Sequence, residues 1–117
     1  MKIKKLLLAS ALLFSAYNVS AQTQVIAHRG FWKTEGSAQN SIAALLKADS
    51  IGCYGSEFDV WLAADDQLVV NHDPTFKGKR MENSPSTALT AIKLDNGESL
   101  PTLAKYLKAA QPLHTRL

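Results

Sequence analysis

The chain has 117 residues, of which 13 are Lys or Arg and 10 are Asp or Glu, so its formal net charge at pH 7 is +3. Three of the lysines lie within the first five residues, and the rest of the chain carries ten basic and ten acidic residues. This balance gives no argument for nucleic acid or an anionic membrane as a partner, and the single cysteine, Cys53, excludes an intrachain disulfide.

The first 21 residues have the order of a secretory signal peptide. Three lysines form a positive head, Leu6–Tyr17 is an apolar run, and Val19, Ser20 and Ala21 supply small residues for cleavage. The apolar run is shorter than the roughly 20 residues that cross a membrane. We therefore expect cleavage after Ala21 and an exported protein, periplasmic or secreted, with no stable membrane anchor. The alternative is an N-terminal anchor that stays uncut.

Residues 22–117 have the pattern of short strands alternating with helices. The expected strands are Val25–Ala27, Ser56–Leu62 and Leu68–Val70, followed by the approach to another strand at 114–117. The expected helices are Ser41–Ser50 with Asn40 as its N-cap, a short one within Thr87–Leu94, and one that opens at Pro101 and Thr102. This order predicts a parallel α/β architecture. Because one βαβ unit cannot cover both faces of a parallel sheet, we expect the N-terminal part of a larger fold.

Two apolar stripes predict which helix faces are buried. In the first long helix the stripe consists of Ile42, Leu45, Leu46 and Ala48 or Ala44. In the second it consists of Leu103, Ala104, Leu107 and Ala110. Between them, residues 75–98 are mostly polar.

Glu57 and Asp59 indicate a metal site. They fall on one face of a predicted strand, and two buried carboxylates so close together need a compensating positive charge. A hard divalent cation with oxygen ligands provides that charge. The alternative is an exposed strand face on which both carboxylates are solvated.

Three further residues follow predicted strands, where reactive groups gather in α/β barrels. His28 and His72 suit proton transfer near neutral pH. Arg29 suits a phosphate, because its guanidinium binds two oxygens at once. Each also has a structural alternative: His28 could bond to backbone at a strand end, and His72 could cap the turn at Asp73.

Together these residues resemble the glycerophosphodiester phosphodiesterase family. The matching stretches are Ile26–Gly30, Gln39–Ser41, Glu57–Val60, Val69–Asp73 and Pro101–Leu103. The resemblance implies an N-terminal fragment of a TIM (β/α)₈ barrel of the phospholipase C-like phosphodiesterase type. It also implies a metal-dependent hydrolase that cleaves small glycerophosphodiesters to glycerol 3-phosphate and an alcohol.

The resemblance assigns a role to each residue. His28 and His72 are the expected catalytic acid and base, and Arg29 is the phosphate ligand. Glu57 and Asp59 are the expected ligands of one divalent cation, Mg²⁺ or Ca²⁺, which polarises the phosphodiester and helps position the nucleophile.

The chain departs from the family pattern in two ways. Gln39 stands where the family usually has Glu, and a third acidic ligand and a lysine are expected on strands beyond Leu117. We therefore expect residues 22–117 alone to fold poorly and to be inactive. The alternatives are a related phospholipase-type phosphodiesterase, of the phosphatidylinositol or sphingomyelin type, and an inactive remnant that binds metal and phosphate without turnover.

Overall fold

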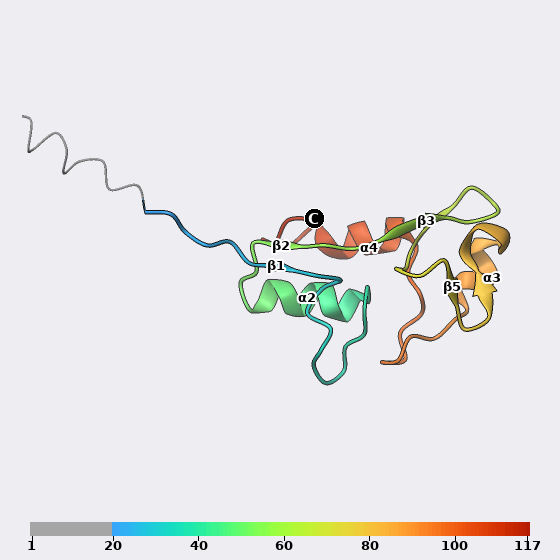
Figure 1. The fold of residues 1–117 in the computed structure, drawn as a ribbon, viewed down its shortest axis with the longest axis horizontal. Helices are drawn as coiled ribbons and strands as arrows, with labels where there is room; N and C mark the ends of the chain where they lie inside the picture. Colours follow the sequence, from blue (N-terminus) through green and yellow to red (C-terminus); the bar gives the residue numbers. More distant parts are fainter. Residues whose placement is uncertain (1–19) are drawn as a thin grey trace, which may run out of the picture.

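A computed structural model describes residues 20–117 (Figure 1). The predicted signal peptide, residues 1–21, therefore lies almost entirely outside the described residues, and its cleavage stays a prediction. None of the helices described between residues 20 and 117 combines the length and apolar character needed to cross a membrane.

A parallel pair of strands forms the part of the fold that bears the site. Strand β1 (Ile26–Ala27) pairs in parallel with β2 (Gly55–Ser56), with Ile26 opposite Gly55. On the other side of β2, Gly55 forms a parallel bridge with Arg116, so the predicted approach to a further strand at 114–117 is confirmed. Helix α2 (Ile42–Ser50) connects β1 to β2, and α4 (Leu103–Ala110) precedes Arg116. The result is a partial α/β fold.

The predicted strand Ser56–Leu62 is not continuous. It divides into β2 and β3 (Val60–Leu62), and β3 pairs with β4 (Leu68–Val70) in an antiparallel hairpin. The expectation of one strand was wrong because its two halves have different partners. The Glu57 N–H still bonds to the carbonyl of Ala27, at 2.9 Å, but β1 then turns away, and the Asp59 carbonyl instead accepts from Asn71 at 3.0 Å.

Helix α2 begins one residue later than predicted. Its N-cap is Ser41, whose hydroxyl accepts from the Ala44 N–H at 3.0 Å, and not Asn40. Thr102 caps α4 in the same way, through the Lys105 N–H at 3.2 Å. The sequence therefore places both helices correctly, with an error of one residue at the first cap.

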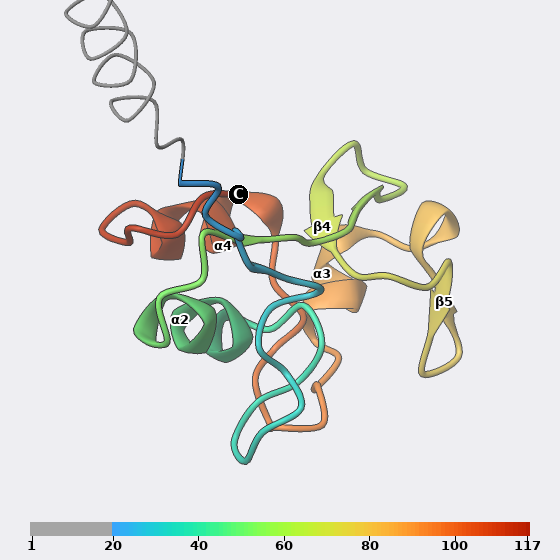
Figure 2. The same cartoon turned by 60° about the vertical axis from the view of Figure 1, so that its left-hand side comes forward.

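The predicted apolar stripes are only partly buried. Ala44, Leu45 and Ala48 of α2 are buried, whereas Leu46 is 44% exposed. In α4 the residue that is fully buried is Tyr106, and Leu107 is 43% exposed. Tyr106 is turned inward because its ring packs on Phe58, with 4.7 Å between the ring centroids. Leu45, Val70 and Tyr106 form a small core between α2, α4 and β4, and Figure 2 shows the two helices side by side.

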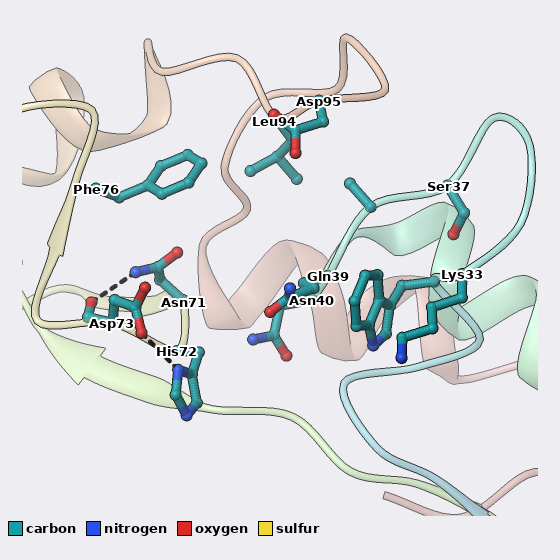
Figure 3. Close-up of a pocket in the computed structure, with 12 residues that line it drawn as sticks. Lys33, Ser37, Gln39, Asn40, Asn71, His72, Asp73, Phe76, Leu94 and Asp95 are labelled. Carbon is teal, nitrogen blue, oxygen red and sulfur yellow. Dashed lines mark hydrogen bonds and ion pairs between the residues drawn. The ribbon is translucent and has the colours of Figure 1, made fainter.

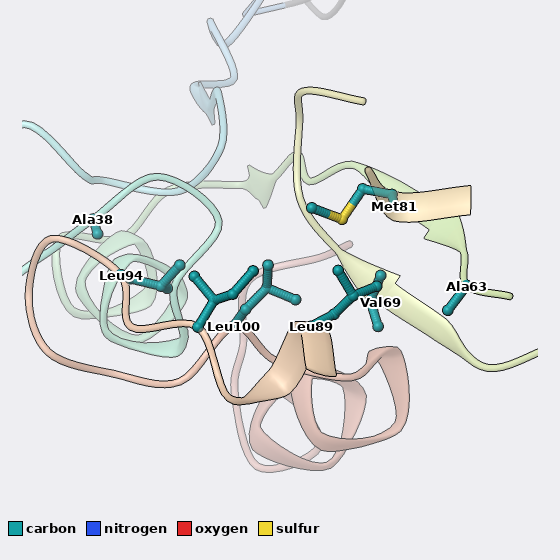
Figure 4. Packing of buried hydrophobic residues seen from close by; sticks show 8 residues of the cluster. Ala38, Ala63, Val69, Met81, Leu89, Leu94 and Leu100 are labelled. Atoms are coloured by element: carbon teal, nitrogen blue, oxygen red, sulfur yellow. The ribbon is translucent and has the colours of Figure 1, made fainter. Parts of the chain in front are cut away.

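The stretch 75–98 is more structured than its polar composition predicts. It contains a short hairpin, β5 (Thr75–Phe76) with β6 (Lys79–Arg80), then η1 (Met81–Asn83) and α3 (Ser86–Thr90). The predicted short helix overlaps α3, but the hairpin was missed because each strand has only two residues. Figure 4 shows how Met81, Leu89 and Leu100 are buried around Val69, which fixes this stretch beside β4.

Candidate active site

A tight turn after β1 sets the position of the first predicted site residues. Arg29 and Gly30 both have positive φ, 59° and 77°. A Cβ on Gly30 would lie 2.6 Å from the Cβ of Ala44, so only glycine lets the turn pack on α2. The Phe31 N–H then donates to the Ala44 carbonyl at 3.0 Å. Helix α2 therefore anchors the turn that carries His28 and Arg29.

The loop after this turn returns to Arg29. The Asn40 N–H donates to the Arg29 carbonyl at 3.0 Å, which closes the loop and brings Gln39 and Asn40 beside the arginine. Asn40 has a positive φ of 57° and is only 3% exposed. The predicted cap residue is instead part of the site.

Arg29 lies beside three of the other four predicted site residues. Its backbone N–H donates to Oε2 of Glu57 at 3.0 Å, and its Nη2 lies 2.8 Å from Nε2 of His72. Its Nε lies 3.9 Å from Oδ2 of Asp59. His28 is further out: its side chain is 70% exposed, and its Nε2 is 3.8 Å from Oε2 of Glu57. The five residues form one cluster, with Arg29 at the centre and His28 at the edge.

His72 is held on both ring nitrogens. Arginine only donates hydrogen bonds, so Nε2 accepts from Arg29 and the ring proton lies on Nδ1. That Nδ1 donates to Oδ1 of Asp73 at 2.6 Å (Figure 3). The carbonyl of His72 also accepts from Nε1 of Trp61 at 3.1 Å. Asp73 was not among the predicted site residues, although its place next to His72 in the sequence is a usable signal.

Asn40 is the second residue that the sequence prediction missed as a member of the site. Its Nδ2 donates to Oδ2 of Asp59 at 3.0 Å, and its Oδ1 accepts from the Asp59 N–H at 3.4 Å. These two bonds fix the carboxylate across a separation of 19 residues. A cap assignment from local sequence cannot reveal such a contact.

Glu57 and Asp59 suit a divalent cation. Hydrogen bonds from Arg29 and Asn40 reach only Oε2 of Glu57 and Oδ2 of Asp59, so each carboxylate keeps its second oxygen for an ion. Mg²⁺ is commonly bound through one or two carboxylates together with substrate phosphates and water. Within residues 20–117 no group of three or more His, Cys, Asp and Glu side chains is close enough to hold a metal ion. Glu57 and Asp59 therefore fit an ion that takes its remaining ligands from substrate, from water or from residues outside the range 20–117.

A cavity of about 310 Å³ lies beside the cluster, and Figure 3 shows it. It includes His72 but none of the other four predicted residues. Gln39, Asn40 and Asp73 contribute polar groups, and the apolar lining comes from Trp32, Phe76 and Leu94. A small molecule in this cavity would meet His72 on one side and an aromatic surface on another.

Tyr106 is a buried tyrosine close enough to Glu57 for the two groups to interact electrostatically. Burial raises the pKa of Tyr106 from its ordinary value of 10.0 to about 12; the Ser56 hydroxyl opposes this rise, and the negative charge of Glu57 adds to it. The Tyr106 side chain has no exposed surface. Within residues 20–117 neither its hydroxyl nor that of Ser56 has a partner at full hydrogen-bond geometry, so the contact between the two hydroxyls is weak. The phenol is therefore held neutral.

Comparison with known proteins places this geometry in context. No protein-family model matches the chain. A curated glycerophosphodiester phosphodiesterase of Caldanaerobacter subterraneus subsp. tengcongensis is 46% identical over 54 residues, which is 46% of this chain and 21% of that protein. The crystal structure of a glycerophosphodiester phosphodiesterase from Parabacteroides distasonis is 56% identical, with a TM-score of 0.77, over 80% of this chain and 39% of that one.

A second solved structure adds a ligand. An Oleispira antarctica phosphodiesterase, solved with the product sn-glycerol-3-phosphate, is 30% identical, with a TM-score of 0.64. The match covers 77% of this chain and 40% of that one. The chain thus spans about two fifths of the solved structures that it matches.

The fold and the comparisons together define the class. The chain has part of the (β/α)₈-barrel fold of these phosphodiesterases, which confirms the predicted fold class. Its curated and structural relatives indicate the glycerophosphodiester phosphodiesterase family, of whose solved members the chain covers a part.

Proposed function

We propose that the protein hydrolyses glycerophosphodiesters to glycerol 3-phosphate and an alcohol, using one divalent cation. The observation that carries this proposal is the position of Arg29, which contacts Glu57 and His72 and lies beside Asp59. The expected phosphate ligand, the two carboxylates and one of the expected acid–base residues thus lie within one cluster. The product bound to the Oleispira relative supports the same substrate class.

Arg29 would bind the phosphate of the substrate. Its guanidinium has five N–H donors, and hydrogen bonds to Gln39 and His72 use only two of the nitrogens. The Nε is buried and has no hydrogen-bond partner. A phosphate from solvent would instead meet the second N–H of Nη1 and of Nη2, and charge-assisted bonds of this kind are strong.

The two histidines would carry the protons. Nε2 of His72 carries the basic lone pair, because Nδ1 holds the ring proton against Asp73. That lone pair accepts from Nη2 of Arg29, so it would take a proton once Arg29 turns this donor to the phosphate. His28 lies at the open side of the cluster, next to Glu57. One histidine would take the proton of the attacking oxygen, and the other would give a proton to the leaving alcohol.

Glu57 and Asp59 would hold the ion, Mg²⁺ or Ca²⁺, through their free oxygens. When bound, such an ion withdraws electron density from the phosphoryl oxygens and stabilises the charge that develops on them. The two carboxylates supply the negative charge that retains it.

The cavity beside His72 would take an organic part of the substrate. Its lining by Trp32, Phe76 and Leu94 offers apolar contacts, and its polar lining includes His72, which contacts Arg29. Glycerophosphodiesters arise when phospholipids lose their acyl chains, so the activity belongs to glycerophospholipid breakdown. Export of the protein would bring it to such substrates outside the cytoplasm.

Release of glycerol 3-phosphate from glycerophosphocholine by the intact protein tests this function. His28→Asn and His72→Asn should each lower the rate by about 10²- to 10⁴-fold, the usual contribution of acid–base catalysis. His114→Asn is the matched control, because His114 is an exposed histidine whose N–H bonds to Asp49 of α2. Wild-type protein that binds phosphate but releases no glycerol 3-phosphate would instead support a binding role without turnover.

A further inference from the structure

Gln39 makes the shortest contact to the guanidinium of Arg29. Nη1 of Arg29 donates to Oε1 of Gln39 at 2.6 Å, while Nη2 faces His72 at 2.8 Å. The Arg29 side chain is 19% exposed, and these two bonds hold both terminal nitrogens of its guanidinium. The residue that departs from the family pattern therefore touches the expected phosphate ligand directly.

The chemistry of arginine determines how the Gln39 amide is turned. Arginine cannot accept a hydrogen bond, so the amide oxygen, and not the amide nitrogen, must face Arg29. That oxygen is thereby directed at the guanidinium. Within this arrangement the amide oxygen serves Arg29 and is not presented to an ion on Glu57 and Asp59.

Charge distinguishes Gln39 from the glutamate that the family resemblance leads one to expect at this position. A carboxylate at this position would form an ion pair with Arg29, and charge-assisted bonds of this kind are roughly twice as strong as neutral ones. It would also add a negative charge to a cluster that already contains Glu57 and Asp59. Both effects oppose the binding of an anionic phosphate, and the neutral amide avoids both.

We infer that Gln39 is a positioning residue for phosphate recognition, which holds the Arg29 guanidinium beside His72 while leaving its positive charge for the phosphate. The inference rests on the proposed function for the identity of the substrate. It differs from a metal-ligand role for position 39, in which an amide oxygen would be a weaker ligand than the carboxylate of glutamate.

Two substitutions separate these roles. Gln39→Glu keeps the size of the side chain and adds the charge, and Gln39→Ala removes the contact. Gln111→Glu is the matched control, since it makes the same charge change at an exposed residue at the end of α4. Gln39 is exposed, so the variants should fold like the wild type, which circular dichroism would check.

The first measurements are titrations of the intact protein with inorganic phosphate and, separately, with Mg²⁺ and Ca²⁺. We expect Gln39→Glu to weaken phosphate binding by about tenfold, which corresponds to about 1.4 kcal/mol. Gln39→Ala should weaken it by about threefold, as loss of one modest hydrogen bond does. Affinity for the ion should change by less than about threefold, the range of a solvent-screened charge.

Equal phosphate affinity in wild type, Gln39→Glu and Gln111→Glu would overturn the inference, as would a wild type that binds no phosphate. Tighter ion binding by about tenfold in Gln39→Glu, with phosphate binding intact, would assign position 39 to the metal site instead.

Kinetics with glycerophosphocholine separate this inference from the proposed function. Gln39→Glu should raise KM with little change in kcat, because it weakens binding of the phosphate in ground state and transition state alike. Turnover with the same KM in wild type and Gln39→Glu would reject the positioning role and keep the function. Phosphate binding that depends on Gln39, without turnover, would keep the positioning role and reject the function.

Discussion

Asn40 binds Asp59 at two points, donating from Nδ2 to the carboxylate at 3.0 Å and accepting the backbone N–H at 3.4 Å. Asn40 is also one of the non-glycine residues with a positive φ, a conformation that asparagine tolerates better than most residues do. Side-chain chemistry and backbone conformation thus both favour asparagine at this position.

Substitution of Asn40 should separate these two contributions. Asn40→Gly keeps the backbone conformation and loses the bonds, so unfolding free energy should fall by about 1–3 kcal/mol. Asn40→Ala loses the bonds and adds the strain of a left-handed residue, about 1–2 kcal/mol more. Urea denaturation of the two variants measures the difference. Equal stability of glycine and alanine variants would show that the backbone is not constrained here.

The carboxylates should be needed for the ion and not for the fold. The double variant Glu57→Gln and Asp59→Asn should abolish metal-dependent hydrolysis and ion binding by calorimetry, while its melting temperature stays close to that of the wild type. Both side chains are partly exposed, at 40% and 27%, so their neutral analogues should be accommodated without a large stability change.

The control for this experiment is Glu82→Gln with Asp95→Asn, which removes the same two charges at exposed positions, 56% and 88% accessible. It should bind the ion like the wild type. Activity that is unchanged in EDTA would contradict the metal assignment altogether.

Gly30→Ala should be more damaging than an ordinary glycine substitution. It introduces a left-handed alanine and places a Cβ 2.6 Å from that of Ala44. We expect a loss of about 3 kcal/mol or more, since overpacking adds about 1–3 kcal/mol to the strain. Gly78→Ala is the control: Gly78 has a similar φ of 80°, but no atom lies within 4 Å of its added Cβ. If urea denaturation shows the same loss of unfolding free energy in both variants, the close contact with Ala44 does not add to the cost of the Gly30 substitution.

Tyr106 should make the protein sensitive to alkali. Its pKa is raised to about 12 in the folded state from 10.0, so the folded state binds its proton more tightly than the unfolded state. The corresponding stability is fully present below about pH 10 and is lost as the pH rises towards about 12. A pKa difference of this size corresponds to about 2–3 kcal/mol.

Tyr106→Phe is the test of this linkage. Within residues 20–117 the hydroxyl has no well-formed hydrogen bond, so the variant should be as stable as the wild type, or slightly more stable, at pH 7. Between pH 10 and 12 its denaturation midpoint should fall less steeply. Parallel pH profiles for the two proteins would show that another group governs alkaline unfolding.

Export predicts a mature N-terminus at Gln22. The motivation is the order of positive head, apolar run and small residues in the first 21 positions. N-terminal sequencing of protein recovered outside the cytoplasm should therefore begin at Gln22. An Ala21→Pro substitution is expected to block cleavage, because it replaces the small residue at the cleavage site. Recovered protein that still begins at Met1 would contradict the prediction.

The residues of the candidate site could be selected from the sequence, because their types and order can be recognised without coordinates. His28, Arg29, Glu57, Asp59 and His72 all follow or interrupt short apolar runs, and the structure brings all five into one cluster. Their catalytic and metal-binding roles stay predictions. The positions of the long helices also followed from local signals, since caps and apolar spacing depend on neighbouring residues alone.

Other features were decided only by the tertiary structure, because they depend on contacts between distant residues. The break between β2 and β3 arises from a change of pairing partner, and the inward turn of Tyr106 arises from its contact with Phe58. The hydrogen bonds of Asn40 to Asp59 and of Gln39 to Arg29 likewise join residues that are 19 and 10 positions apart in the sequence. By itself the sequence determined which groups are available for phosphate and metal chemistry. The folded chain determined which of them touch, because hydrogen-bond geometry is set by packing between elements and not by local pattern.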